Sequence, residues 1–175
     1  VRFDAPPGWI DEVENAVKLI RENMKEYDVL VTGNEIFQAR TKGVGVITKE
    51  QAIDWGLSGP VARASGVDFD IRRDDPYCIY DRFEFDVPVR YEGDVFAKYE
   101  VRLEEMRQSL RIVEQAVAQI RNVEGPIIAK VPKMIKPPVG EIYTRAEASK
   151  GEIGVHLISD GSPKPYRVKL RRPSF

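Results

Sequence analysis

Apolar residues recur at alternating spacings of three and four along residues 10–31. The members of this series are Ile10, Val13, Val17, Ile20, Met24, Tyr27 and Val31. Because an α-helix has about 3.6 residues per turn, this spacing places them on one face of a helix that begins after Pro6-Pro7-Gly8. Glycine and asparagine favour a bend or cap, so the pattern predicts a break at Thr32-Gly33-Asn34 and a short continuation from Phe37 to Arg40.

A second series with the same rhythm runs from about Gly93 to Arg121. Its members are Val95, Tyr99, Leu103, Met106, Leu110, Val113, Val117 and Ile120. At about 1.5 Å per residue, this helix would be about 40 Å long, which is more than a small domain needs. Two such helices predict part of a helical bundle; the alternative is a helical hairpin with its own core. Thr48-Lys49-Glu50-Gln51 has the order of a capping box and predicts a short helix that ends near Gly56.

The C-terminal third has a different pattern. Prolines at 126, 132, 137 and 138 exclude a helix and predict an extended connector over residues 126–140. Alternating apolar positions flank Ser159-Asp160-Gly161-Ser162, which is typical of a β-hairpin. We therefore expect an α+β fold that is mostly α. Residues 1–125 would form the helical portion, with an irregular loop rich in Arg and Asp at 57–90, and residues 141–175 would form a small antiparallel sheet.

Composition narrows the possible functions. The chain is 42% hydrophobic and 31% charged with a formal net charge of −1, so it can bury a core and has no basic excess suited to nucleic acid. No run approaches the roughly 18 apolar residues that cross a bilayer. Cys78 is the only cysteine, which excludes an internal disulfide and a cysteine-ligated cluster built by this chain alone.

Candidate chemistry is sparse when the residues are considered alone. A catalytic triad would need His156, the only histidine, but alternation in a strand turns it away from the face of Val155 and Leu157, so a surface or sheet-face histidine is the better interpretation. An acidic run between residues 68 and 86 suggests a divalent metal site. The interleaved arginines at 63, 72, 73 and 82 instead favour a structural network of ion pairs, and we predict no metal site.

Several ordered motifs resemble one protein family. Residues 57–77 contain Ser58-Gly59-Pro60, then Arg63-Ala64-Ser65-Gly66, then Asp70-Ile71-Arg72-Arg73 and Pro76-Tyr77, and Phe83-Glu84-Phe85-Asp86-Val87-Pro88 follows. Further runs are Glu104-Glu105-Met106-Arg107, Glu147-Ala148-Ser149-Lys150-Gly151 and Ser159-Asp160-Gly161. In this order they resemble the 49-kDa-type subunit of respiratory complex I over essentially the whole chain.

The resemblance implies a central-to-C-terminal fragment of the quinone-reducing subunit of a proton-pumping NADH:quinone oxidoreductase. We expect this fragment to be inactive alone and to bind no cofactor itself, with quinone as the substrate of the intact complex. Electrons would come from an iron-sulfur cluster in a partner subunit. The implied partners are the small iron-sulfur subunit, the 30-kDa-type subunit and the membrane arm, which would hold the chain peripherally at the cytoplasmic face of the membrane.

The resemblance also implies site residues. Residues 147–151 are similar to the E-A-P-R-G segment that holds an arginine over the metal of [NiFe]-hydrogenase large subunits. Lys150 at that arginine position, together with Glu147, would then line the quinone chamber, although Ser149 replaces the usual proline. The alternative is that Lys150 only pairs with Glu147 or Glu152.

Other positions have less direct roles. Arg2 would lie near the iron-sulfur cluster of the partner. The resemblance suggests structural roles for five motif residues: Arg63, Gly66, Arg72, Asp160 and Gly161. Arginine can donate several hydrogen bonds at once, and glycine permits close approach of the loop to the bundle.

Two other functions stay open at this stage. The large subunit of a membrane-bound [NiFe] hydrogenase, or of a related energy-converting dehydrogenase, would share the bundle. A purely structural bundle that scaffolds partner subunits is the third hypothesis. In a bundle, further helices would cover the two apolar faces. Without those helices the isolated chain would expose apolar surface, so it is also predicted to self-associate.

Overall fold

The computed structural model describes residues 5–123, 125, 130–132 and 134–173. Its helices are α1 (Trp9–Tyr27), the π-helical η1 (Asp28–Thr32), α2 (Glu35–Thr41), α3 (Lys49–Asp54), α4 (Gly59–Ala64), α5 (Ile71–Asp74), the 3₁₀-helical η2 (Tyr80–Arg82) and α6 (Val95–Ile120). Strands β1 (Gly140–Ala148), β2 (Gly151–Ser159) and β3 (Arg167–Arg171) form an antiparallel sheet in that order. The predicted mostly helical α+β class is confirmed.

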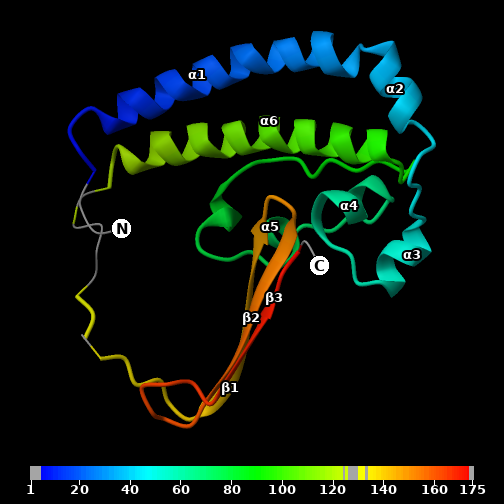
Figure 1. Ribbon diagram of the computed structural model, residues 1–175. Coiled ribbons are helices and arrows are strands. Elements are labelled where there is room, and N and C mark those ends of the chain that lie inside the picture. Colours follow the sequence, from blue (N-terminus) through cyan, green and yellow to red (C-terminus); the bar gives the residue numbers. More distant parts are fainter. Residues whose placement is uncertain (1–4, 124, 126–129, 133, 174–175) are drawn as a thin grey trace.

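The two long helices, α1 and α6, run side by side in opposite directions (Figure 1). Their predicted apolar faces meet, because Val17 and Met24 of α1 form a buried cluster with Leu103 and Leu110 of α6. Tyr99 packs at the edge of this cluster, and its hydroxyl lies 2.9 Å from that of Thr32. The pair of helices therefore forms one layer with its own apolar seam.

Polar side chains cap α3 and α6 at the places where the sequence predicts that these two helices start. Thr48 and Gln51 form the complete capping box that begins α3, as predicted. Asp94 begins α6, since its Oδ1 accepts a hydrogen bond from the Ala97 N–H at 2.7 Å. Its Oδ2 accepts another from the Gly43 N–H at 2.8 Å, so one carboxylate also fixes the turn that precedes α3.

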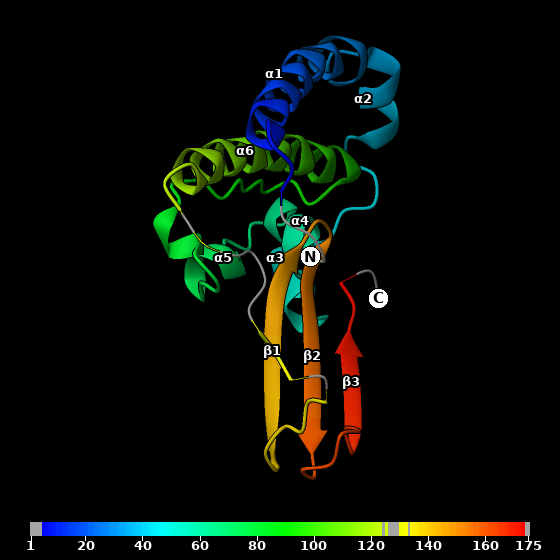
Figure 2. The same cartoon turned by 90° about the vertical axis from the view of Figure 1, so that its left-hand side faces the viewer.

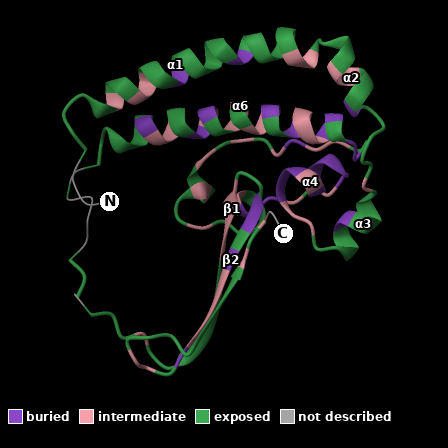
Figure 3. Ribbon diagram, in the orientation of Figure 1, coloured by how far each residue is buried: buried purple, intermediate pink, exposed green. Residues whose placement is uncertain are grey.

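A second layer of short helices and loops lies against the other side of α6 (Figure 3). Ala64 of α4 packs on Ala97 and Val101, and all three are at most 1% exposed. Small side chains at these positions let the backbone of α4 come close to α6.

Gly59, at the start of α4, adopts a φ of +64°, and a Cβ placed there would lie 2.3 Å from the Cα of Gly151. Only glycine fits this contact. The turn between β1 and β2 is thereby held against α4.

The sheet extends away from the helices as a long arm (Figure 2). Ala148 pairs with Gly151 at the inner end of the β1–β2 hairpin, and Gly140 pairs with Ser159 at the outer end. The predicted turn follows β2, where the Asp160 carboxylate accepts a hydrogen bond from the Ser162 N–H at 2.9 Å and Gly161 has a φ of +87°. The inner end of the arm thus reaches α4 and α5, and the Asp160 turn lies at the far end.

Two sequence predictions fall partly or wholly outside the described residues. Of the connector predicted at 126–140, the described part has no helix or strand before β1 begins at Gly140. Arg2 is not among the described residues. No helix in the described ranges has the length and apolar character required to cross a membrane.

Candidate functional site

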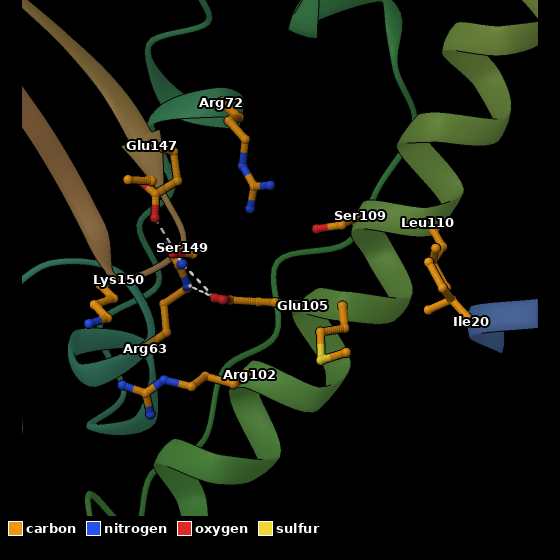
Figure 4. Close-up of a pocket in the computed structure, with 12 residues that line it drawn as sticks. Ile20, Arg63, Arg72, Arg102, Glu105, Ser109, Leu110, Glu147, Ser149 and Lys150 are labelled. Carbon is orange, nitrogen blue, oxygen red and sulfur yellow. Dashed lines mark hydrogen bonds and ion pairs between the residues drawn. The ribbon is translucent and has the colours of Figure 1, made fainter. Parts of the chain in front are cut away.

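A cavity of about 650 Å³ lies between α6 and the inner end of the β1–β2 hairpin (Figure 4). Charged, polar and apolar side chains from both layers line it: Ile20, Arg63, Arg72, Arg102, Glu105, Met106, Ser109, Leu110, Glu147, Ala148, Ser149 and Lys150. Its volume is within the range of small-molecule sites. The helical spacing of α6 brings Arg102, Glu105 and Met106 to the same side of the helix, facing the hairpin.

Arg63 of α4 connects three elements around this cavity, and its side chain is only 1% exposed. Its Nε donates a hydrogen bond to Oε1 of Glu105 on α6 at 2.8 Å, and its Nη2 donates to Oε1 of Glu147 on β1 at 2.9 Å. Its Nη1 donates to the carbonyl of Phe69 at 3.0 Å. A buried guanidinium needs such a full set of acceptors, so these contacts fix the packing of α4, α6 and β1.

Asp70, which is buried, and Arg72, which is largely buried, form a second ion pair beside Arg63. The Asp70 side chain is fully buried, and its two oxygens accept hydrogen bonds from Nε and Nη2 of Arg72 at 3.0 and 2.7 Å. Burial alone would raise the pKa of Asp70. The hydrogen bonds and charge of Arg72, together with the charge of Arg63, outweigh burial and lower this pKa below its usual value.

The pKa values of the two glutamates that bond to Arg63 shift in the direction opposite to that of Asp70. Burial raises the pKa of both Glu105 and Glu147 above the usual value, and the charge of Arg63 offsets this effect only in part.

The Tyr77 hydroxyl accepts a hydrogen bond from the Glu147 N–H at 3.1 Å, and burial raises the pKa of Tyr77 to about 12. Tyr77 is therefore neutral at physiological pH.

Lys150 and Arg102 are exposed cations at the rim of the cavity. The alternative in which Lys150 pairs with Glu147 or Glu152 is not observed. Glu147 bonds to Arg63, and Glu152 accepts a hydrogen bond from the Tyr143 hydroxyl and lies 3.5 Å from Arg145. Within the described residues, Lys150 has no ion pair.

Lys150 and Arg102 also line a neighbouring cavity of about 430 Å³. Arg171 and Arg172 lie in the wall of this second cavity. Because the two rim cations border both cavities, the larger one has a positively charged edge on this side.

The structure brings together four of the residues singled out in the sequence. Lys150, Glu147, Arg63 and Arg72 all line the larger cavity. Asp160 and Gly161 lie at the far end of the sheet, away from it. Gly66 has a φ of +83°, and a Cβ there would lie 2.9 Å from the Tyr91 ring, so its role is a close contact between loops.

The predicted ion-pair network in the Arg/Asp-rich loop is confirmed. Arg73 pairs with Asp68 and Asp74, and Asp70 pairs with Arg72. His156 lies on the sheet with Nε2 at 2.6 Å from Oε1 of Glu141, in line with the predicted sheet-face role.

Sequence reasoning missed Glu105 and Arg102. Both belong to α6, where the prediction rested on the apolar series and gave no role to the charged residues between its members. A useful signal was available, because Arg102 and Glu105 are three residues apart and therefore share a helix face with Met106 and Ser109 nearby. That signal does not identify Arg63 as the partner.

Comparison with known proteins gives a consistent family match. The family model described as "Respiratory-chain NADH dehydrogenase, 49 Kd subunit" matches residues 1–138 and 130–175. A subunit of NADH-quinone oxidoreductase from Desulforamulus reducens is 56% identical over the whole chain, which covers 47% of that protein. The corresponding subunit from Geobacillus kaustophilus is 57% identical, again over the whole chain and 47% of its own length.

A solved structure shares the fold. A chain in the structure of the membrane-bound sulfane sulfur reductase, an archaeal respiratory membrane complex, matches with a TM-score of 0.91 and 38% identity. The match covers 99% of the present chain and 48% of that chain. The chain thus spans about half the length of the relatives it matches.

Proposed function

The chain belongs to the family of 49 kDa subunits of the respiratory-chain NADH dehydrogenase, and we propose that it contributes to quinone reduction by an NADH:quinone oxidoreductase. In this proposal, the residues that line the 650 Å³ cavity form one wall of the quinone site. The observation that carries the proposal is the combination of a rim cation, Lys150, with an apolar surface in a single cavity of suitable size.

The chemistry of a quinone fits this lining. Its ring oxygens accept hydrogen bonds and gain negative charge during reduction, whereas its ring and side chain are apolar. Lys150 and Arg102 supply donors and positive charge at the rim, and Met106 and Leu110 supply apolar surface on α6. A cation placed where negative charge develops favours reduction, because a partly enclosed site screens charge less than bulk water does.

Electrons must reach this site from outside the chain. Cys78 is the only cysteine, so this chain alone cannot ligate an iron-sulfur cluster through cysteines. We assign the cluster to a partner subunit, the small iron-sulfur subunit, and assign further contacts to the 30-kDa-type subunit and the membrane arm. The chain would then act peripherally, at the cytoplasmic face of the membrane, through these partners.

A second function is favoured by one observation. The matched chain from the sulfane sulfur reductase is 38% identical and covers almost all of this sequence. The same scaffold can therefore belong to a complex with another substrate, and the [NiFe]-hydrogenase large subunit is a further alternative. The higher identity of 56–57% to two NADH-quinone oxidoreductase subunits supports the quinone assignment.

Kinetics of the intact complex test the proposal. Lys150→Ala should raise the apparent KM for quinone by about tenfold, which corresponds to one charged hydrogen bond of about 1.4 kcal/mol. Lys150→Arg, which keeps the charge, should recover most of the affinity. Lys164→Ala, an exposed lysine in the turn at the far end of the sheet, is the matched control.

The scaffold hypothesis predicts another result. If the chain only holds partner subunits, Lys150→Ala would leave the apparent KM unchanged even where it lowers the amount of assembled complex. Native gel electrophoresis measures assembly separately from turnover. An unchanged KM in a fully assembled Lys150→Ala complex would refute the quinone-site assignment.

A further inference from the structure

Two largely buried carboxylates share one donor atom beside the cavity. Nη2 of Arg63 donates to Oε1 of Glu105 at 2.5 Å and to Oε1 of Glu147 at 2.9 Å. The side chains of these glutamates are 13% and 5% exposed, and both line the cavity. Their oxygens are therefore close to each other, in a place where water screens their repulsion poorly (Figure 4).

The surrounding charges do not balance when every group is ionised. The buried cluster contains two arginines, Arg63 and Arg72, and three carboxylates, Asp70, Glu105 and Glu147. One negative charge is left over in a region with little solvent. Binding a single proton makes the cluster neutral, which is the favourable state for a buried group.

The other groups that face the cluster do not change this balance. Arg102 and Lys150 line the same cavity but are exposed, so solvent screens their charges. Tyr77, which contacts the backbone of Glu147, stays neutral. Asp70 stays ionised because its hydrogen bonds with Arg72 lower its pKa, whereas burial raises the pKa of both glutamates.

We propose that Glu105 and Glu147, held on Arg63, share one proton at neutral pH and donate it to quinone reduced in the cavity. This role rests on the proposed function for the identity of the acceptor. Quinone takes up two electrons from the iron-sulfur cluster of the partner and two protons to become quinol. The pair supplies one proton: a carboxylic O–H bond breaks, a quinol O–H bond forms, and the pair is left fully ionised. Water supplies the other proton and restores the pair.

The first test detects the proton without turnover. Infrared spectra of the oxidised intact complex at neutral pH should contain the carbonyl band of a protonated carboxylic acid that disappears in Glu105→Gln or in Glu147→Gln. Glutamine has the shape of a protonated glutamate and no net charge, so the cluster should keep its packing. Glu100→Gln, which removes a partly exposed partner of Arg90, is the matched control and should keep the band.

The second test is the pH profile of quinone reduction. Each glutamine variant should lose about a hundredfold in kcat at alkaline pH, where water is a poor proton source, while Glu147→Asp retains most of the rate because it keeps an ionisable group. A purely structural role would lower assembly without changing the pH profile.

The outcomes separate the two proposals. A carboxylic acid band that persists in both glutamine variants would overturn the proton-holding pair, as would a wild-type pH profile in both. If the band is lost but Lys150→Ala leaves the quinone KM unchanged, the pair holds a proton and the quinone-site assignment fails.

Discussion

Removing the guanidinium of Arg63 perturbs the most buried cation near the cavity. In Arg63→Met, the aliphatic part of the side chain is largely kept, but Glu105 and Glu147 lose their shared donor and the Phe69 carbonyl loses a hydrogen bond. Three buried carboxylates then have Arg72 as the remaining cation of the cluster. Breaking a buried ion pair from one side costs about 3–5 kcal/mol, because it leaves a largely buried charge uncompensated.

Urea unfolding of the chain measures this cost. Tryptophan fluorescence at one fixed protein concentration should place the midpoint of Arg63→Met about 2 M below that of the parent, given a typical dependence of about 2 kcal/mol per M. A second substitution, Glu105→Gln, removes one abandoned charge and should recover at least about 1 kcal/mol in the double variant.

An exposed pair provides the control for this experiment. Arg21 bonds to Glu114 at 2.8 Å across α1 and α6, but its side chain is 50% exposed, so Arg21→Met should cost at most about 1 kcal/mol. If Arg63→Met destabilised the chain no more than Arg21→Met, the reasoning that the buried cluster determines the packing of α4, α6 and β1 would be wrong.

Three further outcomes are expected. Gly59→Ala should abolish the native fold, because its Cβ would lie 2.3 Å from the Gly151 Cα. Gly43 also has a positive φ but has no atom within 4 Å of such a Cβ, so Gly43→Ala should lower the free energy of unfolding by only about 1–2 kcal/mol. Equal effects of the two variants in circular dichroism melts would contradict the importance of this contact. Because the pKa of Asp70 is lowered in the folded chain, its ionised form stabilises the fold at pH values above its unfolded pKa of about 3.9. This stabilisation is lost as the pH falls through the lower folded pKa. The stability advantage of the parent over Asp70→Asn should therefore vanish in strong acid. The isolated chain should self-associate, because Val29 and Leu30 of η1 and Ile36 of α2 are 65–74% exposed; light scattering that shows a monomer at every concentration would disprove this expectation.

Local patterns in the sequence were enough to predict most of the secondary structure. The three-four spacing identified both long helices because their apolar faces are buried against each other, and the residues of that seam, such as Val17 and Leu103, are members of the predicted series. The Thr48 capping box and the Asp160 turn were predictable because each depends on contacts within four residues. The π-helical turn of η1 has no comparable local signal.

The site depends on contacts that no local pattern encodes. Arg63 meets Glu105 and Glu147 across 42 and 84 residues of sequence, and the approach of α4 to the hairpin turn sets both contacts. The sequence contained many possible partners for each arginine, and only the topology selects among them. The motifs therefore pointed to Arg63 and Lys150 separately, while the cavity they share became visible in the folded chain.

The most direct test of the quinone-site account is photoaffinity labelling of the intact complex with a photoreactive quinone analogue, followed by mass spectrometry of this subunit. The account predicts labels on residues 102–110 of α6 and on residues 147–150, reduced by excess natural quinone. Labels confined to other parts of the complex, with none on these two segments at saturating analogue, would contradict it.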